Sequence, residues 1–252
     1  MLKRTLLAAV SAALLLGTVS VTAKTPTIED KVLRAGTDSS FAPFEFMGEK
    51  EFEGFDIDLI KAIGKELGYN VIVQNMGFDA TIPALQSRNI DVIIAAMTIT
   101  PERKKVVQFS DPYYTSGLII LVPENNTSIH SIKDLEGKKI AAQIGTTGMF
   151  KAEKIPGAQV KTYANASETF LEFENGGVDA VIQDYPVVAY YLSQKKKGKM
   201  VGEKMEAEEY GIAVAKNNKA LTEDINKAMA KLKANGEYAK IYKKWFGEEP
   251  PK

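Results

Sequence analysis

The sequence contains no cysteine and a single histidine, His130, among its 252 residues. The first absence excludes disulfides, and the two together argue against most zinc sites, cysteine nucleophiles, haem or iron–sulfur ligation and a Ser-His-Asp arrangement. Charge of one sign is not in surplus either, because 32 basic side chains balance 32 acidic ones. Without a basic surplus nothing indicates nucleic-acid binding. We expect no metal, no cofactor and no nucleic-acid partner.

Long hydrophobic runs are also missing, except near the N-terminus. Lys3 and Arg4 precede an apolar stretch that ends at the small residues Val21-Thr22-Ala23. This pattern predicts a secretory signal over residues 1–23, cut near Ala23. The alternative is a membrane anchor, but small and polar residues interrupt the stretch, which favours cleavage. We therefore expect the mature protein to be exported and soluble.

The rest of the chain alternates short β-rich runs with amphipathic segments, which predicts an α/β fold with largely parallel sheets. The expected strands are Val32–Gly36, Val71–Gln74, Val92–Met97, Leu118–Val122, Lys139–Gln143, Val160–Tyr163, Ala180–Gln183 and Ile212–Ala215. The expected helices include Phe55–Leu67, Ala80–Ser87 with Asp79 as its cap, and a final pair at Asn218–Ala234 and Glu237–Phe246. Periodicity alone leaves open whether the strands form one wide sheet or two smaller ones.

Ligands of α/β sheets bind at the carboxyl ends of the strands, so the residues that follow each expected strand are the candidates for a site. Arg103 is the most informative of them, because it stands third in a helix that Thr100 caps and Pro101 begins. A guanidinium and free backbone N–H groups at one place suit a carboxylate. The alternative is a surface ion pair of Arg103 with Glu102 or Asp111.

The other strand ends supply acidic and aromatic side chains. Asp38 and Asp184 are acceptors that suit an ammonium group, and Phe41 and Phe78 could enclose an aliphatic stem. Each has an ordinary alternative, since an aspartate often caps a turn and a phenylalanine usually belongs to the core. An anion site, a cation site and an apolar slot together match the shape of an α-amino acid.

Several long stretches resemble the periplasmic polar-amino-acid-binding proteins of ABC importers (solute-binding protein family 3), and among them the glutamine-binding group. They are GTDSSFAPFEF, GFDIDLIKAIGKELG, IPALQSRNIDVIIAAMTITPERKKVVQFSDPYY, KDLEGKKIAAQIGTTG, VDAVIQDYP, and EYGIAVAK through NGEYAKIYKKWFG. The resemblance covers essentially the whole mature chain. It implies a periplasmic, monomeric binding protein that hands a free L-amino acid to a permease in the inner membrane.

The resemblance also implies the type II periplasmic-binding-protein fold, with two α/β lobes, each a mostly parallel sheet flanked by helices. Lobe one would comprise residues 24–112 and 212–252, and lobe two residues 117–208. Hinge crossings at 113–116 and 209–211 would join the lobes, and hinge closure would trap the ligand.

The resemblance assigns a role to each candidate residue. The ligand carboxylate would be held by Arg103, Thr98, Thr147 and backbone near Ala96, the ammonium by Asp184, the stem by Phe41 and Phe78, and the distal group by Asp38. Gln143 and Gln183 stand where the glutamine-binding pattern has a lysine and a histidine. A lysine at position 143 would repel a cationic ligand, whereas a glutamine does not. We expect glutamine as the ligand, with arginine or another basic amino acid as the alternative.

Other functions remain open at this stage. Some relatives of the family are dehydratases of prephenate-like acids, which need a general acid in the cleft. Here Asp38 and Asp184 are better explained as partners of a bound amino acid, so we expect no enzymatic activity. A sensory role would require a receptor that recognises the closed form.

Overall fold

The computed structural model describes residues 31–195 and 197–251, so the expected signal at 1–23 lies outside the described residues. One of its sheets has the strand order β5 (Asn70–Asn75), β1 (Val32–Thr37), β6 (Val92–Ile93), β14 (Ala213–Ala215) and β7 (Val107–Phe109). The β1 strand runs parallel to β5 and β6, whereas β14 is antiparallel to β6 and β7. We call this sheet and its helices lobe one.

Lobe two is built on a second sheet. Its strands are, in order, β10 (Gln159–Tyr163), β9 (Lys139–Gln143), β11 (Ala180–Asp184), β8 (Tyr114–Val122) and β12 (Lys199–Val201), with β13 (Ala207–Tyr210) also paired to β8. The first three are mutually parallel, and β8 is antiparallel to its neighbours. The expected two-lobe α/β fold is therefore confirmed, with sheets that are mixed. A small third sheet joins β2 (Ser40–Phe41), β3 (Glu45–Met47) and β4 (Phe52–Glu53).

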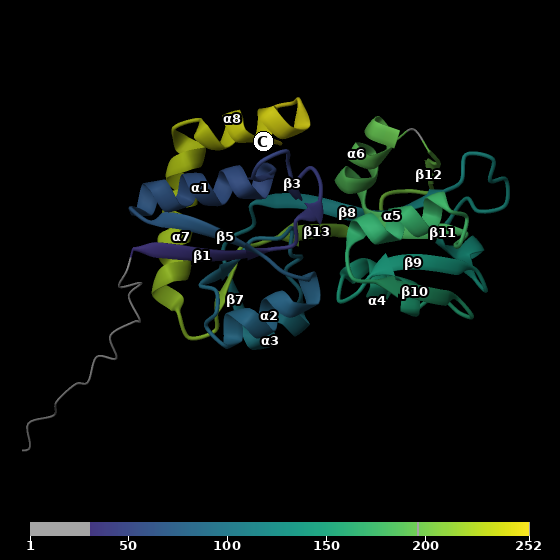
Figure 1. The fold of residues 1–252 in the computed structure, drawn as a ribbon, viewed down its shortest axis with the longest axis horizontal. Coiled ribbons are helices and arrows are strands. Elements are labelled where there is room, and N and C mark those ends of the chain that lie inside the picture. The colour runs from purple at the N-terminus through teal and green to yellow at the C-terminus, as the bar shows by residue number, and fades with distance from the viewer. Residues whose placement is uncertain (1–30, 196, 252) are drawn as a thin grey trace, which may run out of the picture.

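Two antiparallel strands, β8 and β13, connect the lobes (Figure 1). Their register places Tyr114 opposite Tyr210, and these two rings stack with centroids 5.6 Å apart. The preceding residue, Tyr113, donates its backbone N–H to the Tyr210 carbonyl at 2.9 Å. The chain therefore crosses between the lobes as one hydrogen-bonded ribbon, with tyrosines from both crossings in contact.

Helices cover both lobes. In lobe one they are α1 (Phe55–Leu67), α2 (Phe78–Gln86), α3 (Pro101–Val106), α7 (Lys219–Ala234) and α8 (Glu237–Phe246), and in lobe two α4 (Thr147–Glu153), α5 (Ala166–Glu174) and α6 (Tyr185–Lys195). The α1 helix has the expected bounds, because its apolar stripe is buried and Gly68, with φ of 74°, ends it in the left-handed conformation. The α2 helix begins earlier than expected, after Gly77, so Asp79 lies inside its first turn and is not the cap.

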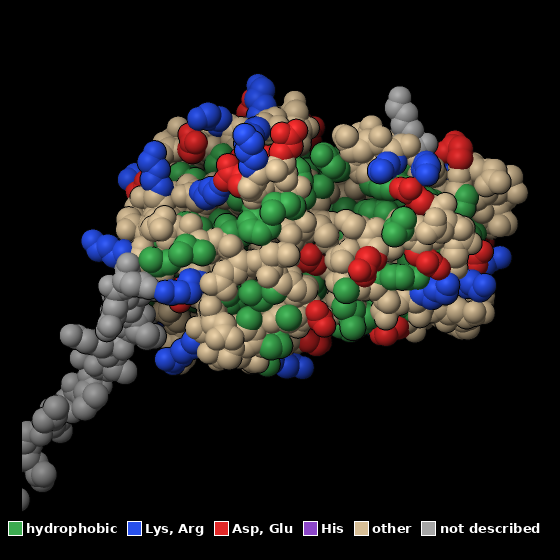
Figure 2. Space-filling view, in the orientation of Figure 1, with side chains coloured by type: hydrophobic (Ala, Val, Ile, Leu, Met, Phe, Trp, Pro, Cys, Tyr) green, Lys and Arg blue, Asp and Glu red, His purple; other side chains and the backbone are tan. Residues whose placement is uncertain are grey.

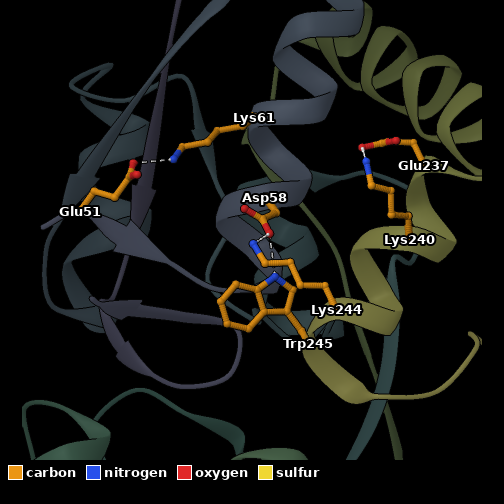
Figure 3. A network of polar contacts seen from close by, with 7 residues as sticks. All are labelled: Glu51, Asp58, Lys61, Glu237, Lys240, Lys244 and Trp245. Carbon is orange, nitrogen blue, oxygen red and sulfur yellow. Dashed lines mark hydrogen bonds and ion pairs between the residues drawn. The ribbon is translucent and has the colours of Figure 1, made fainter. Parts of the chain in front are cut away.

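The C-terminal helices return to lobe one and pack on α1 (Figure 3). Asp58 of α1 accepts hydrogen bonds from Lys244 Nζ at 2.7 Å and from Trp245 Nε1 at 2.8 Å. On the inner side of α8, the ring of Phe246 lies 5.0 Å from that of Tyr114, where β8 begins. The end of the chain thus supports the first crossing strand.

One expected strand is shorter than the sequence indicated. The apolar run Val92–Met97 is almost fully buried, yet only Val92–Ile93 form β6. Beyond it the chain turns, and Ala96 takes a positive φ of 44°. The apolar run therefore predicted burial correctly but not strand length. The backbone after Ile93 instead forms part of the site described below.

The surface offers no broad region of one charge on the side seen in Figure 2, where basic and acidic side chains are interspersed over both lobes. Within residues 31–195 and 197–251, no helix is both long and apolar enough to cross a bilayer.

Candidate functional site

A small, narrow pocket lies between the two lobes. Its lining includes every predicted site residue except Gln183: Asp38, Phe41, Phe78, Ala96, Thr98 and Arg103 from lobe one, and Gln143, Thr147 and Asp184 from lobe two, together with Glu45, Ala95 and Thr146. The sheets thus bring together, at their strand ends, residues that are far apart in the sequence.

Among the residues that the structure describes, Arg103 is the only basic one in this lining. The side chain of Thr100 caps α3 by accepting from the Arg103 backbone N–H at 3.1 Å, as the sequence predicted. The guanidinium donates to the carbonyl oxygens of Thr98, at 2.7 Å, and of Gly145, at 3.0 Å, across the cleft. It also lies 5.1 Å from the centroid of the Phe78 ring. These buried contacts replace the alternative of a surface ion pair.

Burial lowers the pKa of Arg103 to about 10, and the nearby Glu208 and Asp184 charges oppose that shift. The side chain therefore remains a cation at neutral pH. Its planar fork carries five N–H donors, more than the two described contacts use. Arg103 can consequently bind an anion in the pocket without giving up its backbone partners.

The loop after β9 supplies the opposite wall. Gly145 has a φ of 76°, and an added Cβ would lie 3.4 Å from Asp79 of lobe one. That contact would be ordinary, so glycine is favoured here by the left-handed turn that directs the Gly145 carbonyl to Arg103. Thr146 then caps α4 by accepting from the Met149 N–H at 3.2 Å, which places Thr147 at the start of the helix.

Asp184 stands at the end of β11 and is almost fully buried. The hydroxyl of Tyr210, from the second crossing strand, donates to its Oδ1. Burial, followed by the nearby Glu208 charge, raises the pKa of Asp184 to about 7. A carboxylate in this setting gains from an incoming cation, so Asp184 suits an ammonium group.

Asp38 of lobe one makes a second contact across the cleft, to Gln143 of lobe two. Its Oδ1 accepts from the Ser40 hydroxyl at 2.9 Å, and its Oδ2 accepts from Gln143 Nε2 of lobe two. Burial raises the pKa of Asp38, and these hydrogen bonds lower it in part. Because Gln143 is neutral, its amide satisfies the Asp38 oxygen without cancelling the charge.

Glu45 of β3 lines the pocket as well, and the sequence analysis did not select it. It is 1 % exposed, and neither carboxyl oxygen has a hydrogen-bond donor within the described part of the chain. Burial and the Asp56 charge raise its pKa well above the usual range. The one signal available in the sequence was an acidic residue between two phenylalanines, Phe44-Glu45-Phe46.

Asp56 fixes the backbone of the pocket at Ala96. Its Oδ2 accepts from the Ala96 N–H at 2.8 Å and from the Tyr113 hydroxyl at 2.7 Å. Burial raises the pKa of Asp56 to about 6, against the effect of these hydrogen bonds. The left-handed conformation of a non-glycine residue costs free energy, so this contact accounts for how Ala96 is held there.

Glu208 of β13 is a second acidic residue that sequence reasoning missed. Its Oε2 accepts from the hydroxyl of Thr98 at 3.0 Å and from the hydroxyl of Thr147 at 2.9 Å. The two threonines belong to different lobes, so one carboxylate oxygen bridges the cleft. The strand-end rule could not find Glu208, because it lies within a strand.

Gln183 is placed differently from the expectation. It is 1 % exposed and its Oε1 accepts from the backbone N–H of Asp184 at 3.0 Å, while it lies outside the pocket lining. In the described residues, no group of three or more His, Asp or Glu side chains is arranged to hold a metal ion.

The sequence profile of the bacterial extracellular solute-binding proteins, family 3, matches residues 33–248. The chain belongs to this family. The chain is 37 % identical over 224 residues to the arginine-binding extracellular protein ArtP of Bacillus subtilis (strain 168). The alignment covers 87 % of this chain and 88 % of ArtP.

Solved structures agree in fold with this family 3 protein. An ancestral arginine-binding protein bound to arginine is 50 % identical, with a TM-score of 0.84, and covers 86 % of this chain and 99 % of its own. An ancestral arginine-binding protein bound to glutamine is 49 % identical, with a TM-score of 0.81 and the same coverage of both chains. An ancestral amino-acid-binding protein described as a precursor of cyclohexadienyl dehydratase is 41 % identical, with a TM-score of 0.81 and coverage of 86 % and 96 %.

Proposed function

We propose that the protein captures a free L-amino acid in the cleft and delivers it to the permease of an ABC importer. The observation that carries the proposal is that Arg103 of lobe one and Asp184 of lobe two, both buried, line the same pocket. A carboxylate bound to Arg103 and an ammonium bound to Asp184 would neutralise both groups. The family and the arginine- and glutamine-bound solved structures support this assignment.

The remaining charges of the pocket favour a ligand with a cationic side chain. Once Arg103 and Asp184 are paired with the ligand backbone, Asp38 remains, beside Glu45, whose raised pKa favours its neutral form. Among the described residues, the lining holds no second basic side chain. Gln143 supplies only a neutral amide to Asp38. Leaving a buried carboxylate without a cation is costly, so a guanidinium or ammonium tip beside Asp38 is favoured. We therefore propose arginine, or another basic amino acid, as the ligand.

Glutamine, which the sequence analysis put first, is the second candidate. Its amide could donate to Asp38 in place of Gln143, and a related protein has been solved with glutamine bound. A neutral tip would leave the Asp38 charge uncompensated, which is why we rank it below arginine.

Closure of two lobes over the ligand is the proposed mechanism. We take residues 24–112 with 212–252 and residues 117–208 as the two lobes, with the paired strands β8 and β13 as the hinge. Contacts from Arg103 to Gly145 and from Gln143 to Asp38 would form only when the lobes come together. In this proposal the mature chain, released by cleavage near Ala23, acts as a monomer in the periplasm.

Thermal melts of the mature protein, refolded free of carried-over ligand, test the proposal against arginine, lysine, histidine and glutamine. A ligand at about a thousand times its Kd adds about 4 kcal/mol to the free energy of unfolding. We expect the largest rise in Tm with arginine. A larger rise with glutamine would reverse our order of ligands, and no rise with any amino acid would overturn the function.

The dehydratase alternative has a direct test. The fold is shared with a precursor of cyclohexadienyl dehydratase, so the protein should be incubated with prephenate and with arogenate. We expect no product, because Asp38 and Asp184, the two carboxylates that end strands at the pocket, are assigned to binding. Turnover that disappears in the Asp184→Asn variant would establish an enzyme instead.

A further inference from the structure

Glu208 makes a contact that the proposed function does not require. It sits on β13, opposite Ser116 of β8, in the ribbon that joins the lobes. Its Oε2 nevertheless reaches into the cleft and accepts both threonine hydroxyls, at 3.0 Å from Thr98 and 2.9 Å from Thr147. Arg103 lies near enough for the Glu208 charge to stabilise the guanidinium. One carboxylate therefore has two hydroxyl donors and a neighbouring guanidinium.

This arrangement is the one proposed for the carboxylate of the ligand. A threonine hydroxyl carries a single proton, so while it donates to Glu208 it cannot donate to a second acceptor. Two carboxylates at the same place would also repel each other beside Asp184, whose pKa the Glu208 charge already raises. Glu208 and a bound carboxylate therefore exclude each other from the two hydroxyls.

We propose that Glu208 is a built-in competitor for the ligand carboxylate, which the ligand must displace from Thr98 and Thr147. The inference rests on the proposed function. It adds that Glu208, on the hinge strand β13, lowers the affinity of the pocket for the amino acid. Ligand binding would release Glu208 from both lobes at once. Displacement of Glu208 thus ties occupancy of the pocket to the crossing strand that carries it.

The consequence for affinity is opposite to that of an ordinary binding residue. Replacing Glu208 by glutamine keeps the size of the side chain and removes the charge that competes. Each hydrogen bond to a charged group contributes substantially to stability, so the Glu208→Gln variant should bind arginine roughly tenfold more tightly than the wild type. A residue that merely supports the site would instead lower affinity when changed.

The test is isothermal titration calorimetry of the mature protein with arginine, glutamine and agmatine, the decarboxylated analogue of arginine. Agmatine has no carboxylate to displace Glu208, so Glu208→Gln should not tighten its binding. The matched control is Glu209→Gln, because Glu209 neighbours Glu208 on the same strand, carries the same charge and is exposed. We expect this control to change each Kd by less than twofold. The Glu208→Ala variant should behave as Glu208→Gln does.

The outcomes separate the two proposals. Tighter amino-acid binding in Glu208→Gln, absent with agmatine and absent in Glu209→Gln, would support the competition. Unchanged or weaker binding in Glu208→Gln, with a wild type that binds arginine or glutamine, would overturn the competition alone. A wild type that binds no amino acid would overturn the proposed function and the inference with it.

Discussion

The two lobes hold their halves of the pocket in different ways. In lobe one, Arg103 is fixed by the Thr98 carbonyl, and Ala96 is fixed by Asp56, with each partner in the same lobe. In lobe two, Asp184 receives its hydrogen bond from Tyr210 of the crossing strand, and Gln143 donates to Asp38 of lobe one. Apart from the contacts of Arg103 with Gly145 and of Asp38 with Gln143, the first half is organised by its own lobe, whereas the second depends more on the hinge and on closure.

This difference suggests an order of events for the proposed ligand. A pre-organised group binds with less loss of conformational freedom, so lobe one would receive the carboxylate first. Lobe two would then complete the site as the lobes close, when Asp184 meets the ammonium and Gln143 meets the distal group. Lobe one would provide the common anchor, and lobe two would determine which side chain is accepted.

The largest expected effect comes from removing the anchor in lobe one. Arg103→Ala takes away the one basic side chain that the described residues place in the lining, and it would leave the ligand carboxylate buried and unpaired. We expect a loss of about 2–5 kcal/mol in binding free energy, measured by calorimetry. Lys105→Ala, an exposed lysine on the same helix, is the matched control and should bind as the wild type does. Wild-type affinity in Arg103→Ala would refute the proposed anchor.

The second test titrates Asp184, the proposed ammonium partner in lobe two. Because burial raises the pKa of Asp184 to about 7, the free protein binds a proton there at lower pH. A ligand ammonium requires the ionised carboxylate, so affinity should be constant above about pH 7. Below it, affinity should fall by roughly tenfold per pH unit.

The control for this pH profile is Asp184→Asn, which cannot ionise at position 184. Its affinity should be low and should lose the change centred near pH 7, as measured by calorimetry between pH 5 and 8. An affinity of the wild type that does not depend on pH over this range would contradict the role given to Asp184.

The third test asks whether lobe two selects the side chain. Gln143→Lys would place an ammonium beside Asp38, where it neutralises that carboxylate and repels a cationic tip. Arginine affinity should fall by roughly tenfold or more relative to glutamine affinity. Gln159→Lys, on an exposed position of β10 in the same lobe, is the control for an added charge. Equal losses for both ligands would show that position 143 does not set the specificity.

The smallest expected effect concerns the link between lobe two and the hinge. The Tyr210 hydroxyl lowers the pKa of Asp184 by donating to its carboxylate. Tyr210→Phe removes that donor and keeps the ring, so the midpoint of the pH profile should move to higher pH, with affinity above it only modestly reduced. An unchanged midpoint would show that the crossing strand does not tune the site. Tyr238→Phe, whose hydroxyl donates to the Tyr113 carbonyl, is a control of equal size.

Much of this arrangement could be read from local sequence signals. Thr100, Pro101 and Arg103 formed the expected helix start because capping depends on neighbouring residues only. Asp38 and Asp184 came to the pocket because the first follows β1 and the second ends β11, and the carboxyl ends of both strands face the cleft. Signals within a few residues, combined with the geometry of α/β sheets, were sufficient for these positions.

The parts that were missed depend on contacts distant in sequence. The β13 strand begins within a polar, acidic segment with no strand pattern, and only its pairing with β8 makes it a strand. Glu208 therefore could not be placed in the cleft from its neighbours. Glu45 was missed for a related reason, since a two-residue strand and a three-residue strand turn its side chain into the pocket. The lobe boundaries stay a prediction from the resemblance.

The strand order of the two sheets has a consequence for the way the chain is made. All strands of lobe two come from one continuous segment, β8 to β13, whereas β7 of lobe one joins its sheet only through β14, which follows that segment. A chain that emerges from the ribosome N-terminus first therefore presents all strands of lobe two while the sheet of lobe one still lacks β14. Synthesis of β14 is therefore the step that joins β7 to the sheet behind the anchor half of the pocket.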